Sequence, residues 1–426
     1  GLLRVLRRRA GAAERLSLRH LEAVDDQFVL ALAELCGGGP LRALDLGGCQ
    51  SLTGAALPAL ARIPTLAELG AEYVVGIEDK DILELCANCP ALTHLDVRCC
   101  ERLQDASALS GRAASWIALH LDGCFRLDVS ELLKVGTPGA WAKLQELSLD
   151  GENVDAEHLA CIPRNFRRLR RLTISFAWNL DVPTLQRFAA LGLLDALRLH
   201  QAEQPSDADW ARFFEARRSA GCDGAPAAAE GPWRALSFEG CGLFASRAAL
   251  ALAAAPLPRL TDLNLSNCWN LCDASLGALL RSAGALQRLN LSALPIITAA
   301  ALAPCCAMPW LMELNCDFCD FMQDQMLEFL HRLFAGPPDR ACREGLPAAP
   351  LPPRVAAAAA ALWRRRRLSC ERLQVTNYYN CRYGHEWPLR FTAVEVCEFA
   401  EVVLAGPVGP PPRRLPRARR AAVCFN

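Results

Sequence analysis

Two cysteine pairs with metal-ligand spacing, Cys86/Cys89 and Cys316/Cys319, are the first candidates for chemistry in this chain. Tetrahedral zinc takes four ligands, usually as two such pairs brought together. These two pairs lie at opposite ends of a repeating pattern described below, so a folded array would keep them far apart. We therefore interpret them as small buried apolar residues, and we expect no metal, no cofactor and no disulfides.

The histidines are the second candidates. Seven are scattered along the chain, and three of them, His94, His120 and His200, fall where a strand would face outward, with no serine or cysteine that stands out beside them. Catalysis needs a nucleophile, a base and an orienting group within reach of one another. The chain also lacks the phosphate-binding loop, the G-x-S-x-G elbow and the H-E-x-x-H zinc motif. We therefore expect no enzymatic activity.

The elements that position these residues follow a repeat of about 25 residues. The pattern apolar-x-x-Leu-x-apolar occurs eleven times, first at Leu41 and last at Leu311, with one longer interval of 39 residues after Leu194. Its fourth place is leucine in every repeat: Leu44, Leu69, Leu95, Leu119, Leu147, Leu172, Leu197, Leu236, Leu263, Leu289 and Leu314. Such a period indicates stacked supersecondary units that bury a continuous core.

Later places of the repeat complete the unit. The ninth is cysteine in six repeats, where we expect the S–H group to meet a backbone carbonyl: Cys49, Cys100, Cys124, Cys241, Cys268 and Cys319. The fourteenth is aspartate in four, where we expect a helix N-cap: Asp79, Asp105, Asp273 and Asp324. Apolar pairs three residues apart follow, as on one face of a short helix. Each unit therefore reads as a short strand, a turn and a capped helix.

The segment LTDLNLSNCWNLCDASLGALL at 260–280 and the segment LRALDLGGCQSLTGAALPALA at 41–61 match this unit most closely. They resemble the cysteine-containing class of leucine-rich repeat, best known from F-box ubiquitin-ligase receptors. The resemblance implies an α/β solenoid shaped like a horseshoe, with parallel strands on the concave face and helices on the convex face. We expect about eleven clear repeats and degenerate ends.

The domain organisation follows from where the rhythm holds. We expect an N-terminal cap and degenerate first repeat at 1–40 and the solenoid at 41–335, with a loop insertion at 217–232 rich in Ala, Gly and Pro. Beyond it we expect a low-complexity insertion at 336–367, degenerate C-terminal repeats or a cap at 368–405, and a disordered basic tail at 406–426.

The third, fifth and seventh places should point out of the concave strands and form the candidate partner-binding surface. Acids dominate the first five repeats, with Arg98 as the only cation, and later repeats turn basic and then neutral. The candidates are Asp45, Glu68, Glu72, Asp96, Arg98, His120, Asp122, Glu146, Asp150, Arg171, Arg198, His200, Asn264, Asn290 and Asn315. A solvated polar face is the plain interpretation. The functional one is a surface whose acidic half binds a basic segment of a protein. That hypothesis predicts that reversing Asp96, Asp122 and Asp150 to lysine abolishes binding.

Charge and hydropathy narrow the class of protein. Lys and Arg together equal Asp and Glu at 46 each, which argues against a dedicated nucleic-acid binder. No apolar run approaches the ~18 residues of a membrane span, and no secretory signal is visible. We therefore expect neither a membrane nor a nucleic-acid partner, and a cytoplasmic location, with the nucleus as the alternative.

Three functions stay open. The resemblance implies the substrate-binding subunit of an SCF-type E3 ubiquitin ligase, which directs ubiquitin-dependent protein degradation. In that family an F-box binds the Skp adaptor; no F-box is visible here, so Skp adaptor and cullin are expected partners only if one lies upstream of Gly1. The alternative is a non-catalytic scaffold of a cytoskeletal or ciliary assembly. A Ran-type GTPase-activating protein ranks third, because the tail is basic where that class is usually acidic.

Overall fold

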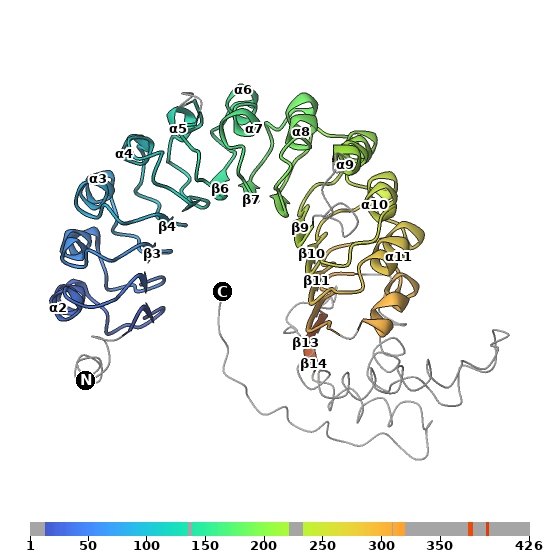
Figure 1. The fold of residues 1–426 in the computed structure, drawn as a ribbon. Coiled ribbons are helices and arrows are strands. Elements are labelled where there is room, and N and C mark those ends of the chain that lie inside the picture. The colour runs from blue at the N-terminus through green and yellow to red at the C-terminus, as the bar shows by residue number, and fades with distance from the viewer. Residues whose placement is uncertain are drawn as a thin grey trace, which may run out of the picture.

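A single curved sheet runs through the whole described chain. The computed structural model describes residues 13–134, 139–220, 233–308 and 310–319, together with the backbone of two further strands, Gln374–Asn377 and Leu389–Phe391. Each strand from β1 to β12 pairs in parallel with the next along the chain, and β14 pairs antiparallel with β13. The strands line the inside of an arc and the helices its outside (Figure 1). The α/β leucine-rich repeat solenoid expected from the sequence is confirmed.

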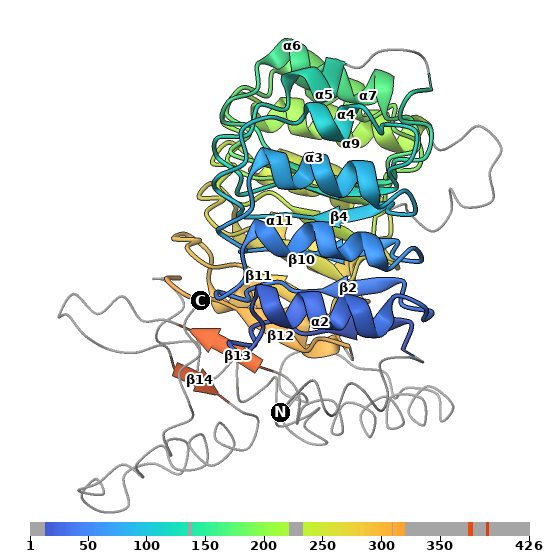
Figure 2. The same ribbon diagram turned by 90° about the vertical axis from the view of Figure 1, so that its left-hand side faces the viewer.

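Strands and helices alternate from β1 to β12, except that two short helices lie between β6 and β7. The strands are β1 Arg15–Ser17, β2 Ala43–Asp45, β3 Glu68–Gly70, β4 His94–Asp96, β5 Ala118–His120, β6 Glu146–Asp150, β7 Arg171–Ser175, β8 Ala196–Leu199, β9 Ala235–Ser237, β10 Asp262–Asn264, β11 Arg288–Asn290, β12 Glu313–Asn315, β13 Gln374–Asn377 and β14 Leu389–Phe391. The helices are α2 Asp26–Cys36, η2 Gly54–Arg62, α3 Asp79–Asn88, α4 Ser107–Ser110, α5 Ser130–Lys134, α6 Ala156–Leu159, α7 Ile162–Asn165, α8 Val182–Phe188, α9 Asp207–Ala220, α10 Ser246–Ala253, α11 Asp273–Ser282 and η4 Ala299–Ala307. Successive outer helices lie roughly parallel, one above another (Figure 2).

The fourth-place leucines form one buried ridge. Strand pairing sets each directly opposite the next, from Leu44 opposite Leu69 to Leu289 opposite Leu314. All eleven are at most 2% exposed. Each buried leucine stabilises the fold by about 1.5–3 kcal/mol relative to an exposed one, and no single repeat supplies enough neighbours to bury its own. The ridge therefore holds the stack together and presents the third, fifth and seventh places on the inner wall.

The ninth-place cysteines bond between repeats as expected. The Sγ atom of Cys268 lies 3.0 Å from the carbonyl oxygen of Phe238, and that of Cys49 lies 3.2 Å from that of Leu18. In all six repeats the acceptor is the sixth-place carbonyl of the preceding repeat. Burial raises the pKa of Cys268 well above its ordinary value, so the thiol stays protonated and able to donate.

The eighth place carries a left-handed turn that residue type alone does not reveal. Glycine stands there in Gly48, Gly123 and Gly240, but residues as large as Tyr73 and Phe176 also adopt positive φ. The conformation is unfavourable for L-residues with a side chain. It is held because the eighth N–H bonds to the seventh carbonyl of the next repeat, as from Tyr73 to Arg98 at 2.9 Å.

The predicted helix caps at the fourteenth place are wrong for Asp79 and Asp273. Both are the first residue of their helices, whose N-caps are the residues before them. Their carboxylates reach forward instead: Asp79 accepts from the backbone N–H of Gln104, and Asp273 from that of Thr298, at 2.8 and 2.7 Å. They join adjacent repeats. Asp105 does accept the N–H of Ser107 near the start of α4, and the predicted cap Asp324 lies outside the described residues.

The predicted loop insertion begins too early. Helix α9 runs to Ala220, so residues 217–220 are helical, and residues 221–232 lie outside the described chain. Arg217 is only 6% exposed and donates to the carbonyl of Leu194 at 2.8 Å, with its guanidinium over the ring of Trp233. It caps the end of the preceding unit from inside the core. The predicted segments 336–367 and 406–426 also lie outside the described residues, as does 368–405 apart from β13 and β14.

Candidate functional site: the concave face

Most acidic side chains in the N-terminal half of the concave face form ion pairs with arginines of the same chain. Arg98 bonds to Asp96 at 2.8 Å and to Glu72 at 3.2 Å, and these carboxylates raise its pKa further. Arg19, from the degenerate first repeat, also pairs with Glu72 and lies 3.5 Å from Asp45. Arg98 is the only lysine or arginine at these places of the first five repeats, but an arginine from outside those repeats also reaches their acids.

Two further arginines pair with two more of these carboxylates. Arg15 on β1 pairs with Glu68 at 2.6 Å, and Arg171 on β7 pairs with Glu146 at 2.9 Å. Seven predicted carboxylates thus face four arginines. A hollow of about 460 Å³ lies over β1 to β6, and its lining includes some of these charged residues, among them Arg15, Arg19 and Glu68. Because the charges are already paired, their field on a basic partner is weaker than the sequence suggests.

Asp122 and Asp150 are the acids of this half that form no ion pair with a described residue, although the charge of Asp122 contributes to the raised pKa of Arg98. The hydroxyl of Ser148 donates to Asp122, and the N–H of Gly123 donates to Asp150 at 2.7 Å. Burial raises the pKa of Asp150 to about 7, helped by the charges of Asp122 and Glu152 and opposed by the hydrogen bond from Gly123. The predicted acidic patch therefore contracts to this pair at the centre of the arc.

His120 lies beside a serine, contrary to the expectation from sequence. Its Nδ1 is 3.3 Å from the Ser148 hydroxyl and its Nε2 is 3.6 Å from Glu146, while burial lowers its pKa. Ser148 is only 5% exposed and directs its proton to Asp122 rather than to the imidazole. This arrangement joins β5 and the turn after it to β6; it leaves the serine oxygen an acceptor and not an activated nucleophile.

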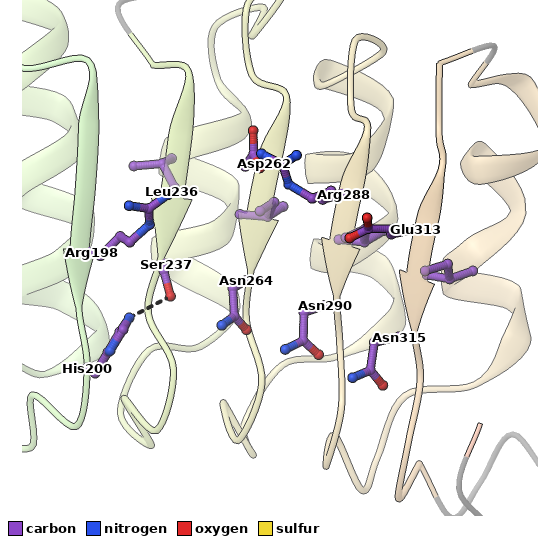
Figure 3. Close-up of a pocket in the computed structure, with 13 residues that line it drawn as sticks. Arg198, His200, Leu236, Ser237, Asp262, Asn264, Arg288, Asn290, Glu313 and Asn315 are labelled. Carbon is purple, nitrogen blue, oxygen red and sulfur yellow. Dashed lines mark hydrogen bonds and ion pairs between the residues drawn. The ribbon is translucent and has the colours of Figure 1, made fainter. Parts of the chain in front are cut away.

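The C-terminal half of the face is a polar hollow of about 460 Å³ over β8 to β12. Asn264, Asn290 and Asn315 occupy the fifth place of three successive strands and lie in one line across the sheet (Figure 3). Each Oδ1 accepts the N–H two residues ahead, at 3.0, 3.1 and 2.9 Å. This Asx geometry fixes the amide so that its NH₂ group points away from the turn.

The donors of this hollow differ in how far they are satisfied. The NH₂ of Asn264 donates to Glu239 at 2.9 Å, whereas those of Asn290 and Asn315 have no partner within the described chain. Arg198 likewise forms no ion pair with a described residue. The Nε2 atom of the neighbouring His200 lies 3.0 Å from the Ser237 hydroxyl, and burial lowers the pKa of His200. Unsatisfied donors on an otherwise rigid wall are available to a ligand.

The structure brings the sequence candidates together on one wall but adds residues that sequence reasoning missed. Arg15 and Arg19 precede the first clear repeat, and their signal was the faint leucine pattern there. Asp262, Arg288 and Glu313 stand at the third place of β10 to β12, the place already assigned to the inner wall; Arg288 and Asp262 form an ion pair between the adjacent strands β10 and β11. Reading every third, fifth and seventh place would have found all three.

Two observations on the described residues concern metal sites and membrane-spanning helices. No three His, Cys, Asp or Glu side chains among them are grouped to hold a metal ion. No helix there has the length and apolar character to cross a bilayer. The CxxC residues Cys86, Cys89, Cys316 and Cys319 are all buried.

Comparison with known proteins gives a fold and no family. No protein-family model matches the chain, and no curated sequence does. A chain of the solved yeast Rad7 and Elc1 complex is similar in structure, with a TM-score of 0.61 and 17% identity, over 75% of this chain and 83% of that one.

Two other solved structures are more distant. An internalin from Listeria monocytogenes has a TM-score of 0.39 and 15% identity, over 71% of this chain and 80% of that one. A TLR13 complex with single-stranded RNA has a TM-score of 0.36 and 15% identity, over 72% of this chain and 48% of that one. The class of protein that the fold defines is a leucine-rich repeat solenoid.

Proposed function

We propose that this chain is the substrate-binding leucine-rich repeat subunit of an SCF-type ubiquitin ligase. In this role it holds a protein target on its concave face and performs no catalytic step itself; the gain in rate comes from proximity to a ubiquitin-loaded enzyme on other subunits. The observation that carries the proposal is the continuous inner wall, with its unsatisfied donors over β8 to β12. The cysteine-type repeat unit and the fold likeness to a chain of the Rad7 and Elc1 complex, itself a protein assembly, support it. We place this activity in the cytoplasm.

The target should contact both halves of the wall differently. At the centre, Asp122 and Asp150 would accept a lysine or arginine of the target, which narrows the basic-segment hypothesis to these two carboxylates. Over β8 to β12, the free NH₂ groups of Asn290 and Asn315 and the guanidinium of Arg198 would bind carbonyl or carboxylate oxygens. A segment that crosses the strands and carries one cation ahead of several acceptors fits this order.

The proposal is tested by affinity purification with paired variants. Asn290→Arg combined with Asn315→Arg places two bulky cations in the hollow without touching the leucine ridge, and should abolish capture of the target. Arg187→Glu, on the exposed side of outer helix α8, is the matched control and should leave capture unchanged. Equal capture by the wild type and the double variant would reject the concave face as the site.

The same experiment separates the ligase role from the scaffold role. If an F-box lies upstream of Gly1, Skp adaptor and cullin should co-purify with the full-length product, and the concave variant should retain them while losing the target. A stable cytoskeletal or ciliary partner without adaptor or cullin would favour the scaffold instead.

A further inference from the structure

A cluster of arginines on the outer rim is not used by the concave face. Arg164 on α7 and the adjoining Arg167 and Arg168 line a hollow of about 500 Å³, whose wall also includes Trp141. Helices α6 and α7 lie at the crown of the arc, on its outer side (Figure 1). All three arginines are exposed, and none forms an ion pair with a described residue.

The turn that carries these arginines is rigidly placed. The Asn165 side chain donates to the carbonyl of Leu133 at 2.7 Å, which anchors α7 to the neighbouring repeat. Phe166 is fully buried and packs on Trp141 with ring centroids 5.4 Å apart. The N–H of Leu169 then closes the turn on the carbonyl of Phe166 at 3.1 Å. The guanidinium groups therefore extend from a fixed backbone, which lowers the entropy cost of binding.

A buried donor lies in the same wall. Trp141 is 1% exposed, and its Nε1 is buried with no hydrogen-bond partner. A buried N–H without an acceptor is costly and uncommon in native proteins. The hollow is thus lined by three arginines without an ion pair among the described residues and by the residue that carries the unsatisfied donor, and no carboxylate is among its lining residues. Such a set favours an anionic ligand over a neutral or cationic one.

The basic residues form a small patch and do not extend along the solenoid. They occupy the end of one repeat, next to Lys143 at the corresponding place of the repeat before. The equivalent places on either side are uncharged: Ser115 in one direction and Leu193 in the other. A nucleic acid, with a phosphate every few ångströms, would need positive charge over several repeats. A single dianionic group fits a charge cluster of this extent.

We propose that this arginine hollow binds the phosphate group of a phosphorylated side chain on a protein partner. Arginine forks bind phosphate oxygens through paired charge-assisted hydrogen bonds, which a lysine or an amide cannot reproduce. The Trp141 N–H would supply a further donor from the wall. This site is separate from the concave face, so it binds whether or not the target proposal for that face holds.

The test measures binding of the purified chain to immobilised degenerate peptide libraries with a central phosphoserine, phosphothreonine or phosphotyrosine. The unphosphorylated libraries and a single-stranded oligouridylate are run beside them, and phenyl phosphate is the competitor. The chain should retain at least one phosphorylated library and release it to phenyl phosphate. Arg167→Ala and Arg168→Ala should each weaken retention by about tenfold, since each removes a charge-assisted pair.

Arg259→Ala is the matched control, because Arg259 occupies in its repeat the place that Arg168 occupies here, and it should bind like the wild type. As a second readout, phenyl phosphate should shift one indole N–H resonance that Trp141→Phe removes. The proposal is overturned if no phosphorylated library binds better than its unphosphorylated counterpart. It is equally overturned if the arginine variants bind like the Arg259 control, or if oligouridylate is retained more tightly.

Discussion

Asp150 should make the stability of this protein depend on pH in a way that one substitution removes. Its pKa rises from 3.8 to about 7 in the folded chain, chiefly because of burial. A raised pKa for an acid means that the folded state holds the proton more tightly than the unfolded state. The associated stability is present in full below about pH 4 and is lost as the pH rises to about 7.

The magnitude follows from the size of the shift. About three pKa units at 1.36 kcal/mol each set a ceiling of roughly 4 kcal/mol. Because Asp150 is only half-buried and water screens its charge, we take about 2 kcal/mol. Asp150→Asn keeps an oxygen that can accept the N–H of Gly123 and removes the charge that faces Asp122. The variant should therefore match the wild type near pH 4 and exceed its stability by about 2 kcal/mol at pH 8.

The assay is urea unfolding at a series of pH values from 4.5 to 8, followed by circular dichroism. Repeat arrays unfold through sums of local terms, so the midpoints of the two proteins are compared at each pH. Asp128→Asn serves as a control of opposite sign, because hydrogen bonds from Ser130 lower the pKa of Asp128 and its charge stabilises the fold at neutral pH. Parallel midpoint curves for wild type and Asp150→Asn, or a less stable variant at pH 8, would refute the reasoning.

Two further predictions concern thiols and the contacts between repeats. Hydrogen bonds from Ser246 and Ser275 lower the pKa of Cys272 to about 7. Iodoacetamide should therefore alkylate Cys272 at pH 7.5 well before the buried Cys268. Peptide mapping by mass spectrometry measures the order, and modification of Cys268 first would contradict the prediction. Asp273→Ala removes two hydrogen bonds from Thr298 and should lower the free energy of unfolding by about 2 kcal/mol. The loss is measured as a lower urea midpoint, with Glu101→Ala at an exposed position as the control. A loss no greater than that of the control would show that this contact between repeats contributes little.

The features that could be predicted from sequence are those that each repeat determines alone. Leucine at the fourth place has one physical use, burial, and its period sets the register that places Leu44 opposite Leu69. The ninth-place cysteine needs a carbonyl, and a parallel stack always supplies one at the same place, as Phe238 does for Cys268.

The features that were missed depend on which residues adjacent repeats bring together. Asp273 has the residue type and place of a helix cap, but the next repeat offers Thr298 as the better donor. Arg19 lies before the first clear repeat, and only lateral pairing shows that it neutralises Glu72. Arg217 stands in a segment whose composition predicts a loop, yet its side chain is buried because it donates to carbonyls of the preceding repeat.

Site-specific photo-cross-linking tests the central claim most directly. A benzophenone amino acid replaces Asn315 on the inner wall or Arg187 on the outer helix α8, and each protein is irradiated with the captured target. Recognition by the inner wall predicts a covalent adduct with the target from position 315 and none from position 187. An adduct from 187 alone would contradict it.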